Sequence, residues 1–172
     1  ERDIVWLDAG DRVFARYGFA ETDEAYMRMP RDVAQTVNEG VGGLCDNTSG
    51  GRVRLCTDSP YIAIQASYPG LCRLAHMPLS GTSGFDLYKE IGGRQFYVGA
   101  YIPPVDTQHT YEGIVYTGNT TGRAVNYVLN FPPYNPVSRL YIGLKAGSRT
   151  ETPDGYYNRK PVVFYGSSIT QG

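Results

Sequence analysis

Residues 123–131, with the sequence RAVNYVLNF, carry the clearest structural signal in the chain. Large apolar side chains alternate there with smaller or more polar ones, the period-two pattern of a strand with one apolar face. The apolar positions are Val125, Tyr127, Leu129 and Phe131. The stretch LYIGLK at residues 140–145 repeats this alternation. Two such segments in close succession predict neighbouring strands, with Pro133–Pro136 as the turn between them.

Further strand-like segments recur along the first 150 residues and are separated by turns rich in glycine and proline. They cover residues 53–55, 61–67, 95–102 and 113–117. Residues 4–7 and 12–17 predict an opening hairpin around the turn Asp8–Asp11. Val33, Val37 and Val41 recur every four residues, but nearby threonine and glycine weaken the helical pattern, so helix and loop both stay open.

Composition supports an all-β protein. The 172 residues include 21 glycines, 11 prolines and 15 tyrosines, with 41% hydrophobic and only 19% charged residues. Such a profile is typical of many short strands joined by tight turns. The length suits one domain with a remnant of a second. We therefore predict an antiparallel β-sandwich of jelly-roll type with about eight or more strands.

The balance of charge excludes several kinds of partner. The formal net charge is −1, and no run of like charges offers the basic surface that nucleic acid or an anionic membrane requires. No stretch approaches the roughly 20 apolar residues of a membrane span. We expect no nucleic-acid partner, no membrane span, no metal and no organic cofactor.

The three cysteines lack the spacing of a metal site. Cys45 and Cys56 flank the turn-like stretch Asn47–Gly51, so a disulfide is one interpretation. Free and mostly buried thiols are the interpretation that we favour, because cysteine commonly behaves as a small buried hydrophobe.

The character of the sequence changes after residue 150. Residues 151–161 are polar and predict a linker, and residues 162–165, VVFY, form an apolar run without alternation. A strand buried on both faces of a parallel sheet has this pattern. The turn Gly166–Ser168 follows it, at the position where a strand end can expose a serine hydroxyl.

Two motifs resemble one known family. Residues 165–172, YGSSITQG, are similar to the first conserved block of the SGNH (GDSL-like) hydrolases, and residues 84–88, GFDLY, are similar to the motif that names the β-rich N-terminal domain of one branch. The stretches GRVRL (51–55), TDS (57–59) and PPYN (132–135) extend the likeness. The resemblance implies three parts: a β-sandwich accessory domain (1–150), a linker (151–161), and the first strand and nucleophile turn of a truncated α/β SGNH hydrolase domain (162–172).

The same resemblance assigns Ser168 as the nucleophile of the parent protein and the backbone of Ser168 as part of the oxyanion hole. Ser167 stands where the family usually has aspartate. The remaining catalytic residues lie downstream, since neither His76 nor His109 matches the family motif. We therefore expect the parent protein to be an SGNH-type esterase or acylhydrolase and this chain to be inactive by itself.

Two functions from different classes stay open. In the first, the chain is the accessory domain of a secreted or periplasmic carbohydrate or acetyl esterase; it packs against its own downstream catalytic domain and completes the cleft for a carbohydrate ester. The alternative is an independent carbohydrate-binding module. Five aromatic residues are candidates for stacking on sugars: Trp6, Tyr61, Tyr101, Tyr134 and Tyr141. We expect Asp86 to be structural and to accept hydrogen bonds from nearby turn amides.

Overall fold

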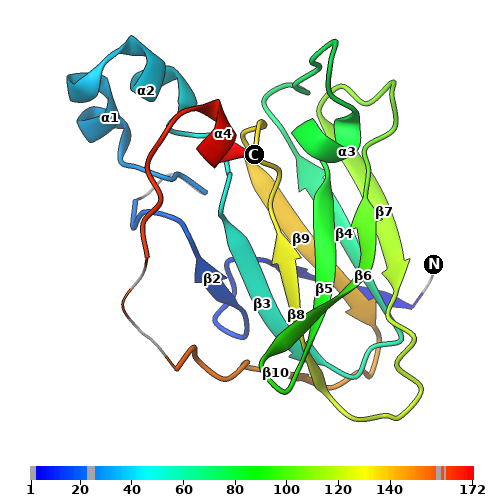
Figure 1. Ribbon diagram of the computed structural model, residues 1–172. Helices are drawn as coiled ribbons and strands as arrows, with labels where there is room; N and C mark the ends of the chain where they lie inside the picture. Colours follow the sequence, from blue (N-terminus) through cyan, green and yellow to red (C-terminus); the bar gives the residue numbers. More distant parts are fainter. Residues whose placement is uncertain (1–2, 23–25, 158–159, 161) are drawn as a thin grey trace.

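Two antiparallel sheets stack as a sandwich in the computed structural model, which describes residues 3–22, 26–157, 160 and 162–172 (Figure 1). The four-stranded sheet has the order β1 (Ile4–Asp8), β9 (Arg139–Lys145), β4 (Tyr61–Ser67) and β7 (Thr110–Tyr116). The six-stranded sheet has the order β10 (Thr150–Glu151), β3 (Arg52–Thr57), β8 (Val125–Asn130), β5 (Phe85–Ile91) and β6 (Arg94–Tyr101), with β2 (Ala15–Tyr17) also paired to β3.

The strand order is that of a jelly roll. When the short strands β2 and β10 are set aside and the remaining eight are counted along the chain, the sheets read 1-8-3-6 and 2-7-4-5. This arrangement is two interlocked Greek keys. The predicted all-β jelly-roll sandwich is confirmed.

The core lies between the sheets and takes its side chains from alternate strand positions. Tyr127 and Leu129 of β8 face Leu140 and Ile142 of β9 across the core, and all four are fully buried. Burying each of the three aliphatic side chains, Leu129, Leu140 and Ile142, stabilises the fold by about 1.5–3 kcal/mol. The period-two pattern at 123–131 and 140–145 thus predicted the buried faces correctly.

The predicted opening hairpin at residues 4–17 is wrong. β1 pairs with β9 in the four-stranded sheet, whereas β2 pairs with β3 in the six-stranded sheet. The connection crosses from one sheet to the other because Ala9 and Phe14 are buried in the shared core. Two strands close in sequence therefore bracket the core instead of pairing.

The turn at Pro133–Pro136 also joins different sheets, so the prediction that it connects neighbouring strands is wrong. β8 belongs to the six-stranded sheet and β9 to the four-stranded sheet. The crossing is fixed by Phe131 and Val137, both buried in the core on either side of the turn.

In the described part of the chain, four short helices lie outside the sheets: α1 (Arg31–Val37), α2 (Glu39–Leu44), α3 (Leu79–Thr82) and α4 (Ser168–Gln171). The segment around Val33 and Val37 is therefore helical, yet both valines are about half exposed and Ala34 is the buried residue of α1. Asn38 is the N-cap of α2, and its side-chain oxygen accepts a hydrogen bond from the Val41 amide at 2.9 Å. No described helix has the length and apolar character to cross a membrane.

The three cysteines are free, and Cys45 is buried. The favoured interpretation of free thiols is confirmed over a disulfide between Cys45 and Cys56. Among the residues that the structure describes, no cluster of three or more histidine, cysteine or carboxylate side chains could hold a metal ion.

Candidate functional site

The proposed nucleophile lies in an exposed turn beyond the sandwich. Residues 162–166 form no regular strand, and the side chains of Val162–Tyr165 are about four-fifths exposed, between 78% and 81%. The predicted buried strand is not formed in this structure, because no described strand pairs with the segment and a parallel strand needs neighbours. Ser168 follows as the first residue of α4. Its assignment as nucleophile and oxyanion-hole donor stays a prediction, as do the domain boundaries.

α4 rests on one end of the sandwich, which we call the loop end and define as residues 47–49 and 132–135. The Tyr134 hydroxyl donates to the carbonyl oxygens of Ser168 at 3.2 Å and Gly172 at 2.6 Å. The Gln171 side chain donates to the Pro133 carbonyl at 2.9 Å, and the Ser49 hydroxyl donates to the Gln171 carbonyl. Figure 1 shows α4 at the same end of the sandwich as α3. The serine turn is thus held by contacts with the jelly roll.

The Ser168 hydroxyl itself has no activating partner here. Within the described ranges no side chain hydrogen-bonds to it, and both His76 and His109 are exposed loop residues. A serine alcohol without a base is a poor nucleophile at neutral pH. The contacts therefore hold the backbone of the serine turn, and the described residues supply no group that could take the hydroxyl proton.

A buried polar network gives the loop end its shape. Asn135 is fully buried; its side-chain oxygen accepts from the Cys72 amide and the Ser83 hydroxyl, and its side-chain nitrogen donates to the carbonyls of Gly70 and Pro136. Thr48, also fully buried, donates to the carbonyls of Pro132 and Asn135. Since Tyr134 stands between these tied positions, its hydroxyl is held in place beneath α4.

The GFDLY motif at 84–88 divides between the two faces of β5. Phe85 and Leu87 point into the core, and Phe85 contacts Phe131 with ring centroids 5.0 Å apart. A Cβ atom on Gly84 would lie 2.9 Å from the Ser80 carbonyl oxygen and 3.1 Å from that of Tyr101, so a side chain does not fit there. Asp86 and Tyr88 lie on the outer face of the six-stranded sheet.

Asp86 is structural, but through a partner different from the one expected. Its carboxylate accepts a hydrogen bond from the Asn130 side chain on the adjacent strand β8 at 2.7 Å, and no described turn amide bonds to it. Burial raises the pKa of Asp86, and the Asn130 hydrogen bond offsets part of that rise. The fold therefore destabilises the ionised carboxylate relative to its protonated form.

We predict that Asp86→Asn raises the free energy of unfolding relative to the wild type, and that this gain is larger at pH 7 than at pH 3. Because the folded pKa of Asp86 is raised, stability falls as pH rises from the ordinary aspartate value through the folded pKa, and the loss persists above it. Asparagine cannot ionise, and its carbonyl can still accept from Asn130. Urea unfolding of both proteins at the two pH values checks this; a gain that does not change with pH would contradict it.

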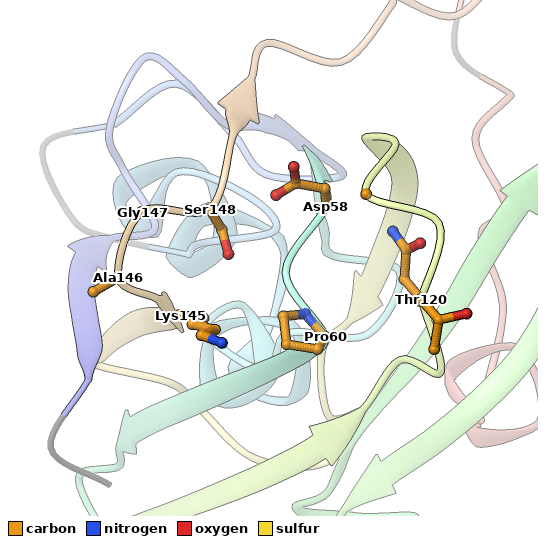
Figure 2. A pocket seen from close by; sticks show the side chains of 9 residues that line it. Asp58, Pro60, Thr120, Lys145, Ala146, Gly147 and Ser148 are labelled. Atoms are coloured by element: carbon orange, nitrogen blue, oxygen red, sulfur yellow. The ribbon is translucent and has the colours of Figure 1, made fainter.

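The other end of the sandwich has an open pocket of about 310 Å³ (Figure 2). Asp58, Lys145, Thr120 and Ser148 are among its lining residues. Asp58 already accepts a hydrogen bond from the Arg149 amide at 2.8 Å, and Thr57 donates to the Arg149 carbonyl at 2.8 Å. The TDS stretch at 57–59 thus fastens the turn after β9, which accounts for these residues without a ligand.

The five aromatic candidates for sugar stacking do not form one platform. Tyr61 and Tyr101 are buried, and Tyr101 donates a hydrogen bond to the Ile62 carbonyl inside the sandwich. Trp6 is 36% exposed and borders a shallow groove of about 200 Å³ on the four-stranded sheet with Ala63, Glu112 and Ile114. Sequence reasoning missed the more exposed rings of Tyr97 and Tyr116, because alternation does not show which end of a strand extends past the core.

A family model described as GxDLY, "N-terminus of Esterase_SGNH_hydro-type", matches residues 4–150. The chain belongs to this family. Its members carry the domain ahead of an SGNH catalytic domain. None of the curated protein sequences matches the chain.

Two solved structures share the fold of this GxDLY domain. A GDSL-like lipase from Bacteroides ovatus ATCC 8483 superposes with a TM-score of 0.78 at 22% identity, over 88% of this chain and 44% of the lipase. The salicylyl-acyltransferase SsfX3 from a tetracycline biosynthetic pathway gives a TM-score of 0.63 at 20% identity, over 91% of this chain and 43% of the acyltransferase. The chain therefore spans less than half of either protein.

Proposed function

We propose that this GxDLY domain is the accessory part of a serine ester hydrolase, that its loop end packs against the downstream catalytic domain, and that it helps to complete the substrate cleft. The observation that carries the proposal is the set of hydrogen bonds from Tyr134, Ser49 and Gln171 that joins α4 to the loop end. The resemblance of residues 165–172 to the first SGNH block supports assigning the nucleophile to this same turn, and in this proposal the loop end lies next to the reacting group.

In this proposal Ser168 attacks the ester carbonyl in the parent protein. A downstream histidine takes the serine proton and returns it to the departing alcohol, and water then releases the acid from the acyl-enzyme. We propose a carbohydrate or acetyl ester as substrate and export from the cytoplasm as the setting; both follow from the resemblance of the two motifs. The isolated chain, which lacks the base among its described residues, is then inactive.

An independent carbohydrate-binding module is the second candidate, and the groove beside Trp6 favours it. Aromatic platforms need exposed rings, however, and two of the five expected rings are buried. A free-standing module also gives no reason for the bonds between α4 and the loop end. We therefore rank it below the accessory domain.

Hydrolysis of a chromogenic acetate ester tests the proposal. We expect turnover by the protein extended through its catalytic domain and none above background by residues 1–172. Serine-dependent turnover by the short chain would show that it contains its own base. An extended protein that is folded but inactive on acetate and longer acyl esters would contradict the assignment as an ester hydrolase.

A further inference from the structure

The outer face of the six-stranded sheet holds a charge pair that is shielded from solvent. Arg54 lies between the inward-facing Val53 and Leu55 of β3, so its side chain points away from the core. Its guanidinium donates to the Glu90 carboxylate on β5 at 2.6 and 3.0 Å. The two side chains are only 6% and 12% exposed. A layer of protein must therefore cover this face of the sheet.

Residues 153–156, which we call the strap, supply part of that cover. The Tyr156 ring centroid lies 4.4 Å from the Arg54 guanidinium carbon and 5.7 Å from that of Arg52. The same ring lies 4.6 Å from the ring of Tyr17 on β2. Arg54 also donates to the carbonyl of Asp154. The strap is thus fixed to β2 and β3, although its sequence is typical of a free linker.

The aromatic ring of Tyr156, and not its hydroxyl, makes these contacts. The hydroxyl oxygen is buried and has no hydrogen-bond partner among the described residues. A guanidinium over an aromatic face is attracted to it, more strongly when both are removed from water. The next residue, Tyr157, is fully exposed. Among the described residues, the strap groups that contact Arg54 are therefore the Tyr156 ring and the Asp154 carbonyl, and Tyr157 adds no such contact.

The path of the chain gives this contact a consequence for the serine turn. The chain leaves β10 at one end of the sandwich and reaches α4 at the opposite end (Figure 1). If the strap were free, the connection toward Ser168 would begin in a flexible segment. A strap fixed to the sheet instead holds the start of this connection against the outer face of the sheet.

We propose that Tyr156 anchors the strap to the outer face of the six-stranded sheet, and that the sandwich and the strap therefore behave as one body. Tyr156 is a positioning residue, since it touches Arg54 and Tyr17 and no reacting atom. The anchoring of the strap does not depend on the proposed function. Only the expected effect of Tyr156 on catalysis rests on the proposed function.

Backbone ¹⁵N order parameters of residues 154–157 in the 172-residue chain test the anchoring directly. In the wild type we expect values near 0.85 at Asp154–Tyr156, as in rigid backbone, and in Tyr156→Ala values below about 0.6. Tyr156→Phe should match the wild type because the hydroxyl has no partner. Tyr157→Ala, which removes the exposed neighbouring ring, is the matched control and should leave the values unchanged.

Flexible wild-type values, or equal effects of the substitutions at 156 and 157, would overturn the proposal. Unchanged resonances of β4 and β9 show that each variant is folded. In the extended protein, Tyr156→Ala should lower kcat/KM several-fold while Tyr156→Phe restores it. If the extended protein is no esterase, the kinetic assay gives no signal, but the order parameters still test whether the strap is anchored. The two proposals can therefore fail separately.

Discussion

Replacing Ser168 by alanine in the protein extended through its catalytic domain should lower kcat for ester hydrolysis by about 10⁴- to 10⁶-fold. Alanine removes the oxygen that forms the acyl-enzyme, and none of the other serine-hydrolase steps can proceed without that intermediate. Binding of the ester does not require the hydroxyl, so KM should change far less. Steady-state kinetics on a chromogenic acetate ester, with active-site titration of the wild type, measures both constants.

Ser167→Ala is the matched control for this substitution. Ser167 precedes α4 as its N-cap, but its side chain makes no capping hydrogen bond, so alanine should leave the turn in place. We expect its kcat to stay within about tenfold of the wild type, a loss far below that of a nucleophile. Equal losses at Ser167 and Ser168, or full activity of Ser168→Ala, would place the nucleophile elsewhere.

Local patterns in the sequence predicted most of the strands but missed β5 and the short β10, and they did not predict which strands pair. Alternation tells which side chains of β8 and β9 face the core, since side chains on a strand point to opposite faces in turn. It cannot tell which sheet a strand joins. The residues that decide this are Ala9, Phe14, Phe131 and Val137, and they act by being buried between the sheets. The two wrong connections, at 4–17 and at 133–136, are both crossings of this kind.

The candidate site also divides into features that a local motif shows and features that depend on contacts between distant residues. The motif at 165–172 is local and could be recognised, and the structure then places its turn against Tyr134. Tyr156 could not be found in this way, because its partner Arg54 is about 100 residues away and the strap has no periodic pattern. Asp86 was correctly expected to be structural, yet its bond to Asn130 depends on the pairing of β5 with β8.

Asn135→Ala should have the largest effect on stability of any single substitution at the loop end. The side chain is fully buried and makes four hydrogen bonds, to the Cys72 amide, the Ser83 hydroxyl, and the carbonyls of Gly70 and Pro136. Alanine leaves these groups buried without their partner, and each orphaned group costs about 1–3 kcal/mol unless it finds another. Some of that cost is recovered, because Ser83 also bonds to the Cys72 carbonyl.

We therefore expect Asn135→Ala to lower the free energy of unfolding by about 4 kcal/mol, and Tm by about 8–16 °C for a chain of this size. Gln108→Ala is the matched control. Among the described residues its exposed side-chain amide bonds only to the Asp106 carbonyl, so the free energy of unfolding should fall by no more than about 0.5 kcal/mol. Urea unfolding followed by circular dichroism measures both. A loss below about 1 kcal/mol at Asn135 would mean that water replaces the side chain at no great cost. The loop end beneath α4 would then owe its shape to the backbone of the Pro132–Pro136 crossing, and Tyr134 would keep its place without the network.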